Sequence, residues 1–238
     1  EIFDRRLHPT GWEEALAAHI DERLFLIGAT GGVGSRLSPK LVEAGHTVKG
    51  LHRKPEQADD LRKQGVEPVL GNIIDMTADD LASAMNGCDT AVFSAGAAGS
   101  GRDKTTAIDG EGPEKLIEAA RATGVNRIYL VSVIMDAGRD RDTSDDFEHY
   151  MAMKRRADAA LATSGIDYVI LRPGTLKDDD GDGKVMAGRA ITYGDVARGN
   201  VAATLAELIG VPEITNEIIE LTNGETPVSD AVARLKRG

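Results

Sequence analysis

Features typical of secreted, membrane-spanning or nucleic-acid-binding proteins are scarce in this sequence. The 238 residues include one cysteine, Cys88, so no internal disulfide can form, and no metal-ligand spacing surrounds it. No apolar run is long enough to cross a bilayer, and residues 1–22 lack the apolar core of a signal peptide. The net charge of −11 argues against a nucleic-acid partner, because phosphate binding relies on clustered Lys and Arg. We therefore expect a cytoplasmic protein with no membrane or nucleic-acid partner.

Aromatic residues are also few, at 4%, so the core must consist mainly of Val, Ile, Leu and Ala, as in parallel strands that are covered on both faces. From Arg23 onward, short aliphatic runs alternate with longer amphipathic stretches, which is the pattern of βαβ units. We predict an α/β fold, a doubly wound parallel sheet with helices on both faces. About seven strands are expected, at residues 23–27, 47–51, 68–70, 90–94, 127–133, 168–171 and 218–221.

The predicted sheet forms a single domain over residues 23–238, with small C-terminal elements on the substrate side. Residues 1–22 form an N-terminal extension in which Trp12, Leu16 and Ile20 fall on one face of a possible short helix. The extension is either a docking helix or an expression remnant. In the first helix, over residues 35–44, Pro39 removes a hydrogen bond and predicts a kinked or shortened helix. Thr77 and Asp80 resemble a capping box that opens a later helix.

A glycine-rich turn follows the first strand and precedes a helical pattern. Gly28 permits a tight turn, Gly31 lets the backbone approach a diphosphate, and Gly34 lets the helix pack close to the sheet. The helix N-terminus would supply amide donors and a partial positive charge. This strand-turn-helix context predicts a Rossmann-type dinucleotide site at Gly28-Ala29-Thr30-Gly31-Gly32-Val33-Gly34, in which Thr30, Gly32 and Val33 also contact the cofactor.

The end of the second strand bears on the choice between NAD(H) and NADP(H). An acidic residue here usually binds the ribose 2′-hydroxyl of NAD, whereas a basic residue accommodates the 2′-phosphate of NADP. This sequence has Arg53 and Lys54, and no acidic residue before Glu56. A guanidinium matches phosphate oxygens bidentately. We therefore expect NADP(H), with NAD(H) as the alternative.

Together these motifs resemble the atypical short-chain dehydrogenases/reductases, the NAD(P)H-binding or NmrA-like relatives of the epimerase/dehydratase enzymes. The resemblance runs from about residue 23 to about residue 235 and rests on the glycine turn, Arg53, Gly71-Asn72-Ile73-Ile74-Asp75, Ser94-Ala95-Gly96-Ala97, Val131-Ser132-Val133, Tyr150-x-x-x-Lys154 and Arg172-Pro173-Gly174. It implies that Asn72 and Ile73 border the adenine. It also implies that Ser94, Ala95 and Gly96 line the cofactor, and that the segment around Pro173 shapes the nicotinamide end.

Tyr150 and Lys154 are four residues apart in a helical stretch, 147–164, so both side chains project from one face. The resemblance implies that Tyr150 donates a proton to a carbonyl, while Lys154 holds the nicotinamide ribose and lowers the phenol pKa. Ser132 would hydrogen-bond the same carbonyl. Asp109 resembles an Asp that stands where longer relatives use a catalytic Asn. The structural alternative is that Tyr150 packs and Lys154 is solvated.

Two further patterns have less functional weight. Asp178, Asp180 and Asp182 copy the first half of a calcium loop, but its twelfth position is Arg189 where a Glu is needed, so we expect no metal and a solvated turn. His149 is expected to be a surface histidine.

The sequence thus predicts an NADP(H)-binding oxidoreductase that transfers hydride to or from a small carbonyl, quinone, flavin-like or epimerase-type substrate, as a monomer or homodimer. The alternative is a non-catalytic NADP(H)-binding redox sensor, because many atypical members lack part of the catalytic set.

Overall fold

The computed structural model describes residues 22–138 and 142–236. Of the proposed N-terminal extension, residues 1–21 lie outside this described part. A nine-stranded sheet has the order β11-β8-β10-β6-β5-β4-β1-β2-β3. Its strands are β1 (Arg23–Ile27), β2 (Thr47–His52), β3 (Glu67–Leu70), β4 (Thr90–Phe93), β5 (Arg127–Val131), β6 (Asp167–Pro173), β8 (Lys184–Gly188), β10 (Glu217–Asn223) and β11 (Thr226–Pro227).

The seven strands expected from the sequence are β1 to β6 and β10, and they pair in parallel throughout. The expected number of strands was too small, because β8 and β11 extend the sheet at one edge in antiparallel orientation. A separate two-stranded parallel sheet joins β7 (Thr175–Lys177) to β9 (Asp195–Ala197). The doubly wound α/β prediction is confirmed, with these short additions in the C-terminal third.

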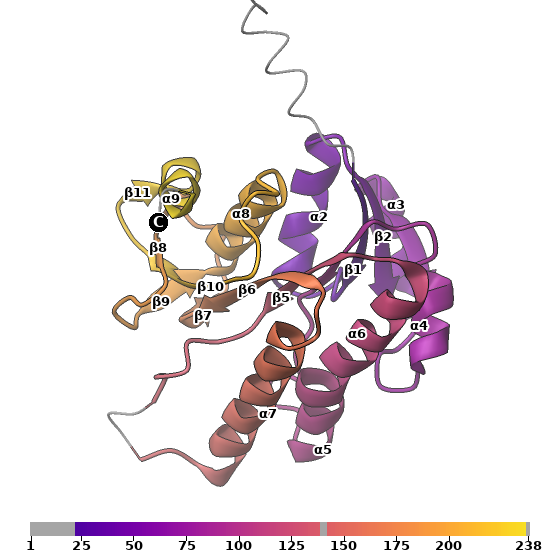
Figure 1. Ribbon diagram of the computed structural model, residues 1–238, viewed down its shortest axis with the longest axis horizontal. Coiled ribbons are helices and arrows are strands. Elements are labelled where there is room, and N and C mark those ends of the chain that lie inside the picture. Colours follow the sequence, from indigo (N-terminus) through magenta and orange to yellow (C-terminus); the bar gives the residue numbers. More distant parts are fainter. Residues whose placement is uncertain (1–21, 139–141, 237–238) are drawn as a thin grey trace, which may run out of the picture.

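Helices cover both faces of the sheet (Figure 1). In β1, Leu24 and Leu26 pack on one face, while Phe25 and Ile27 pack on the other, as the two-residue period of a strand requires. The first face is covered by α2 (Gly34–Glu43), α3 (Ala58–Lys63), α8 (Arg198–Ile209) and α9 (Val228–Leu235). The second face is covered by α4 (Ala78–Ala84), α6 (Gly112–Thr123) and α7 (Asp145–Ala162).

Helix α2 runs through Pro39 and ends at Glu43, so the expected shortening does not occur. Proline lacks an amide hydrogen, so one hydrogen bond is lost at this position. Leu37 and Leu41, on either side of Pro39, are fully buried against the sheet. We attribute the continuity of α2 to this packing, which offsets the missing bond.

Two local features fix the course of loops that lie at the carboxyl edge of the sheet. At the start of α4, Thr77 and Asp80 form the expected capping box, in which the Thr77 hydroxyl accepts from the Asp80 amide at 3.2 Å. After β4, α5 (Arg102–Thr105) leads through a π-helical segment, η2 (Thr106–Glu111), into α6. Among the described residues, no helix is long and apolar enough to cross a membrane.

Candidate active site

A cavity of about 670 Å³ opens at the carboxyl ends of the parallel strands, where α/β sheets bind their ligands. Residues from the beginning, middle and end of the chain line it. Those proposed from the sequence are Gly28, Thr30, Gly31, Gly32, Val33, Arg53, Ile73, Ser94, Ala95, Gly96, Asp109, Ser132, Tyr150 and Lys154. The cavity therefore joins the proposed cofactor turn to the proposed catalytic residues.

Four other proposed residues are not part of the cavity wall. Gly34 begins α2 behind the turn, and Pro173 is buried, its carbonyl accepting from the Ile134 amide at 3.0 Å. The Asn72 side chain donates to Asp75 at 2.7 Å, so it stabilises its own loop. Lys54 is exposed, and its amide donates to the Gln57 side chain at 3.0 Å.

The glycine turn leaves no room for side chains at two positions. Gly28 has a φ of 91°, and a Cβ added to it would lie 2.7 Å from the Ala95 amide nitrogen. A Cβ on Gly34 would lie 2.0 Å from the Gly28 carbonyl oxygen. The turn is closed by a 2.9 Å hydrogen bond from the Gly31 amide to that same oxygen. The bare backbone and the N-terminus of α2 thus form a cradle that fits the diphosphate of a dinucleotide.

Arg53 lies just beyond β2, on an exposed part of the cavity wall. The buried ring of His52 fixes the backbone here, since its Nδ1 lies 2.9 Å from the Lys54 carbonyl oxygen. Within residues 22–138 and 142–236, Arg53 forms no ion pair. Its guanidinium is therefore available to a ligand.

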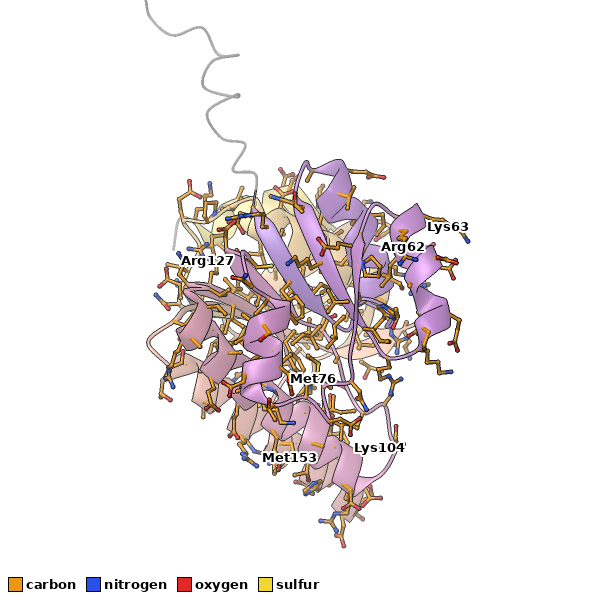
Figure 2. The ribbon with its side chains drawn as sticks, turned by 90° about the vertical axis from the view of Figure 1, so that its right-hand side faces the viewer. Arg62, Lys63, Met76, Lys104, Arg127 and Met153 are labelled. Atoms are coloured by element: carbon orange, nitrogen blue, oxygen red, sulfur yellow. The ribbon has the colours of Figure 1, made fainter. Side chains whose placement is uncertain are left out.

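Asp109 lies in the π-helical segment η2 and is almost completely buried. Its Oδ2 accepts from the Ala97 amide at 3.0 Å, and a Cβ on Gly96 would lie 3.3 Å from Oδ1. The next residue, Gly110, packs closely against α7: a Cβ added to it would lie 2.8 Å from the sulfur of Met153, which is labelled in Figure 2. Wide π turns are frequent at functional sites. Here the wide turn brings a carboxylate between the loop after β4 and helix α7.

The Asp109 carboxylate forms an ion pair with the ammonium of Lys154. Lys154 Nζ lies 3.0 Å from Asp109 Oδ1 and donates to the Val131 carbonyl oxygen at 3.3 Å. Burial acts to lower the pKa of Lys154, but the negative charges of Tyr150, once it is ionised, and of the Asp109 carboxylate outweigh it, so this pKa lies above its ordinary value. Lys154 is therefore a buried ammonium, charged at neutral pH, at the cavity wall.

Tyr150 lies one helical turn before Lys154, whose Nζ is 5.7 Å from the centre of the tyrosine ring. Burial raises the pKa of the Tyr150 phenol above its ordinary value, while the charge of Lys154 acts in the opposite direction. The family resemblance implied that Lys154 lowers the pKa of the Tyr150 phenol. This effect is present, but burial outweighs it. The phenol is protonated at neutral pH, the state that a proton donor requires.

Ser132 follows β5 at the cavity wall, and its amide donates to the Leu171 carbonyl oxygen at 2.8 Å. Among the described residues, its buried hydroxyl makes no hydrogen bond of normal geometry. The neighbouring Asp158 carboxyl pairs with Arg172, whose Nε and Nη2 each lie 2.9 Å from Oδ2. Burial raises the pKa of Asp158, against the opposing effects of Ser132 and Arg172. The Ser132 hydroxyl thus lies buried beneath the cavity wall, close to the Asp158 carboxyl.

His149 differs from its expected place on the surface. The side chain is half-buried, and its Nε2 lies 2.8 Å from the Thr106 hydroxyl, so it connects α7 to η2. This contact holds the helix of Tyr150 against the segment of Asp109, and His149 is not part of the cavity wall. Among the described residues, no group of three or more His, Cys, Asp or Glu side chains is arranged to hold a metal ion.

Several residues of the cavity wall were not predicted from the sequence, among them Gln57, Arg102, Phe147, Leu176 and Arg198. Arg198 is 164 residues beyond Gly34, and no local motif connects it to the glycine turn. One signal was present nevertheless, because Arg198 opens a helix with no acidic residue in its first turn. A cation is disfavoured at this end of a helix unless an anion compensates it.

Comparison with known proteins identifies the family. A family model described as NAD(P)H-binding matches residues 28–212, from the glycine turn to just beyond α8. The chain belongs to this NAD(P)H-binding family. The resemblance to atypical short-chain dehydrogenases/reductases of the NmrA-like type is confirmed, and a nicotinamide cofactor accords with the cradle at the glycine turn.

Relatives within the NAD(P)H-binding family are similar over nearly their whole length. The chain is 35% identical to YhfK of Bacillus subtilis, named an uncharacterised sugar epimerase, over 90% of this chain and all of that one. A Bacillus halodurans structure, provisionally named an NAD-dependent epimerase/dehydratase, has 32% identity and a TM-score of 0.82, covering 90% of this chain and 99% of that one. ChuY of Escherichia coli O157:H7, described as an anaerobilin reductase, has 26% identity and a TM-score of 0.70, covering 84% and 97%.

Proposed function

We propose that the protein is an NADP(H)-dependent oxidoreductase that reduces a small carbonyl or quinone-type substrate. The observation that supports this most is the convergence of Ser132, Tyr150 and Lys154 on the cavity that also contains the glycine turn. A tyrosine and a lysine at this spacing occur by chance in many helices. A buried ammonium beside a cavity-lining phenol, with Ser132 at the same cavity wall, fits a reductive site much better than it fits simple packing.

Side chains of the protein would donate the proton and would bind the substrate oxygen. The bound reduced nicotinamide cofactor supplies a hydride. Tyr150 donates its phenolic proton to the substrate oxygen, which turns a carbonyl into an alcohol, and the Lys154 ammonium stabilises the phenolate that remains. The Ser132 hydroxyl donates a hydrogen bond to the same oxygen and orients it. Asp109 keeps Lys154 charged and in place.

The proposed preference for NADP(H) is supported by the end of β2. Arg53 has no ion-pair partner in the described part of the chain, and it lines the cavity next to Gln57. In this fold the same position meets the ribose 2′ group. A free guanidinium favours a phosphate there, so the wild-type protein should bind NADPH at least about tenfold more tightly than NADH.

The substrate class is inferred from the wall around Tyr150. Phe147 and Leu176 give this part of the cavity apolar surfaces, which suit a flat or small organic carbonyl compound. ChuY, described as a reductase, supports a reductive role, whereas the name given to YhfK suggests an epimerase. An epimerase would use the same tyrosine as a base toward a sugar hydroxyl, so both classes belong in the assay.

The test is a turnover assay with NADPH and a panel of aldehydes, ketones, quinones, flavins and sugar nucleotides. Tyr150→Phe should lower kcat at least about a hundredfold while NADPH binding, measured by fluorescence titration, stays within about threefold. Tyr168→Phe is the matched control, because Tyr168 lies on β6 outside the cavity wall. Turnover that survives Tyr150→Phe would refute the catalytic assignment. NADPH binding without turnover on the whole panel would favour the non-catalytic sensor.

A further inference from the structure

Two helices begin beside the glycine turn, although they are far apart in sequence. α2 follows the turn directly, and α8 packs against α2 on the same face of the sheet (Figure 1). The positive ends of the two helix dipoles therefore meet near one place on the cavity wall. Arg198, the first residue of α8, adds a full positive charge there, and the first turn of α8 has no acidic residue.

The stem of Arg198 crosses the glycine turn in direct contact. A Cβ placed on Gly32 would lie 2.5 Å from Arg198 Cδ and 2.7 Å from its Nε. Among the described residues, the amides of Gly32 and Val33 donate to no other backbone group, so both remain available to an anion. The guanidinium of Arg198 thus lies beside the backbone that would bind a diphosphate.

The only ion pair of Arg198 within residues 22–138 and 142–236 is long. Its Nη1 lies 3.6 Å from Asp178 Oδ1, which is beyond hydrogen-bond distance. The same Asp178 oxygen is 3.3 Å from Nη1 of Arg36, and Arg36 is held more firmly by Asp180 at 2.7 Å. Asp178 is therefore shared between two arginines, and Arg36 keeps a second partner if Asp178 is lost.

Hydrogen bonds that do not involve the Asp178 carboxylate hold the acidic loop that contains Asp178. The Gly199 amide donates to the Asp179 carbonyl oxygen at 3.1 Å, and the Gly183 amide donates to the buried Asn200 side chain at 2.9 Å. The loop would therefore keep its place without the charge of Asp178. Asp178 is mostly exposed, so its carboxylate is well solvated.

We propose that Arg198 binds the diphosphate of the dinucleotide cofactor, and that Asp178 competes with this diphosphate for the Arg198 guanidinium. The inference rests on the proposed function, because it needs a dinucleotide in the cavity. On binding, Arg198 exchanges a long, solvated ion pair for a charge-assisted contact to phosphate beside two helix N-termini. Arg36 stays with Asp180, so the acidic loop does not move.

The experiment measures binding of NADPH and of adenosine 2′-monophosphate by calorimetric titration. The second ligand has the 2′-phosphate but no diphosphate. Arg198→Ala should weaken NADPH binding roughly tenfold or more and leave adenosine 2′-monophosphate within about twofold. Asp178→Asn should tighten NADPH binding at least about threefold, since it removes the competing charge. Arg189→Ala is the matched control, because Arg189 pairs with Glu217 away from the cavity wall.

The outcomes separate this inference from the proposed function. Failure of the wild-type protein to bind NADPH would overturn both. If the wild-type protein binds NADPH and Arg198→Ala binds it with the same dissociation constant, this inference is overturned and the proposed function stands. Weaker NADPH binding by Asp178→Asn would overturn the competition and assign Asp178 to orienting Arg198. If Arg198→Ala fails to fold, Arg198→Gln replaces it, with the circular dichroism spectrum of the wild type as the standard.

Discussion

The buried pair between Lys154 and Asp109 gives the sharpest prediction about stability. Lys154 is 5% exposed and Asp109 is 1% exposed, and their charged atoms are 3.0 Å apart. At an effective dielectric constant of about 20, the Coulomb attraction at this distance is about 5.5 kcal/mol. Much of it offsets the loss of hydration of the two charges. The change Lys154→Met removes the attraction and leaves the desolvated Asp109 carboxylate without its partner.

We expect Lys154→Met to lower the free energy of unfolding by about 3 to 5 kcal/mol, the usual effect of removing one member of a buried pair. Asp109→Asn keeps an oxygen that can accept from the Ala97 amide, but it leaves Lys154 without a countercharge. The double variant contains neither charge. Its loss of stability should therefore be smaller than the sum of the two single losses by about 2 kcal/mol or more.

Urea unfolding followed by far-ultraviolet circular dichroism measures all three free energies, with the m-value as a check on two-state behaviour. Lys63→Met is the control. Lys63 pairs with Asp60 on the exposed surface of α3, at the rim of the molecule (Figure 2), and its loss should leave stability unchanged. Additive losses in the double variant, or a loss below about 1 kcal/mol for Lys154→Met, would refute the reasoning.

The same site supports three other predictions. Arg53→Ala should weaken NADPH binding roughly tenfold or more and NADH binding less than about threefold, with Arg62→Ala on the rim of α3 (Figure 2) as the control, and equal weakening would contradict a 2′-phosphate contact. Gly34→Ala places a Cβ 2.0 Å from the Gly28 carbonyl oxygen and should lower stability by about 1 to 3 kcal/mol, so an unchanged melting midpoint would count against this crowding at the turn. Because the pKa of Lys154 in the folded protein lies above its ordinary 10.5, the pair stabilises fully at lower pH and its contribution is lost as the pH rises through the folded pKa. Urea titrations between pH 7 and 11 should show this loss only above about pH 10.5, and Lys154→Met should lack it.

The central parallel strands could be predicted because they are runs of apolar residues that are buried on both faces. β4 is buried at all four positions, and Leu24 to Ile27 of β1 are buried as well. The strands that were missed lack such a pattern. β8 has a single buried residue, Val185, and β9 has only three residues, so their pairing depends on partners that the local sequence does not reveal.

The candidate site divides in the same way. The glycine turn and the pair Tyr150 and Lys154 were visible because their spacing within one strand-turn-helix unit or one helix already determines how they lie. Contacts between distant elements were not visible. Two such contacts depend on how α7 and α8 pack. The π-helical turn directs Asp109 toward Lys154, and the Arg198 side chain lies against Gly32.

Three of the cations that line the cavity differ in how far the protein has already neutralised them. Lys154 is buried and paired with Asp109, Arg198 has one long contact to Asp178, and Arg53 has no ion-pair partner among the described residues. A group that is neutralised within the protein gains little from an arriving phosphate, whereas an unpaired one gains most. Cofactor affinity should therefore depend more on Arg53 and Arg198 than on Lys154. In the proposed mechanism the charge of Lys154 is instead held beside Tyr150, where it would stabilise the phenolate left after the phenol donates its proton.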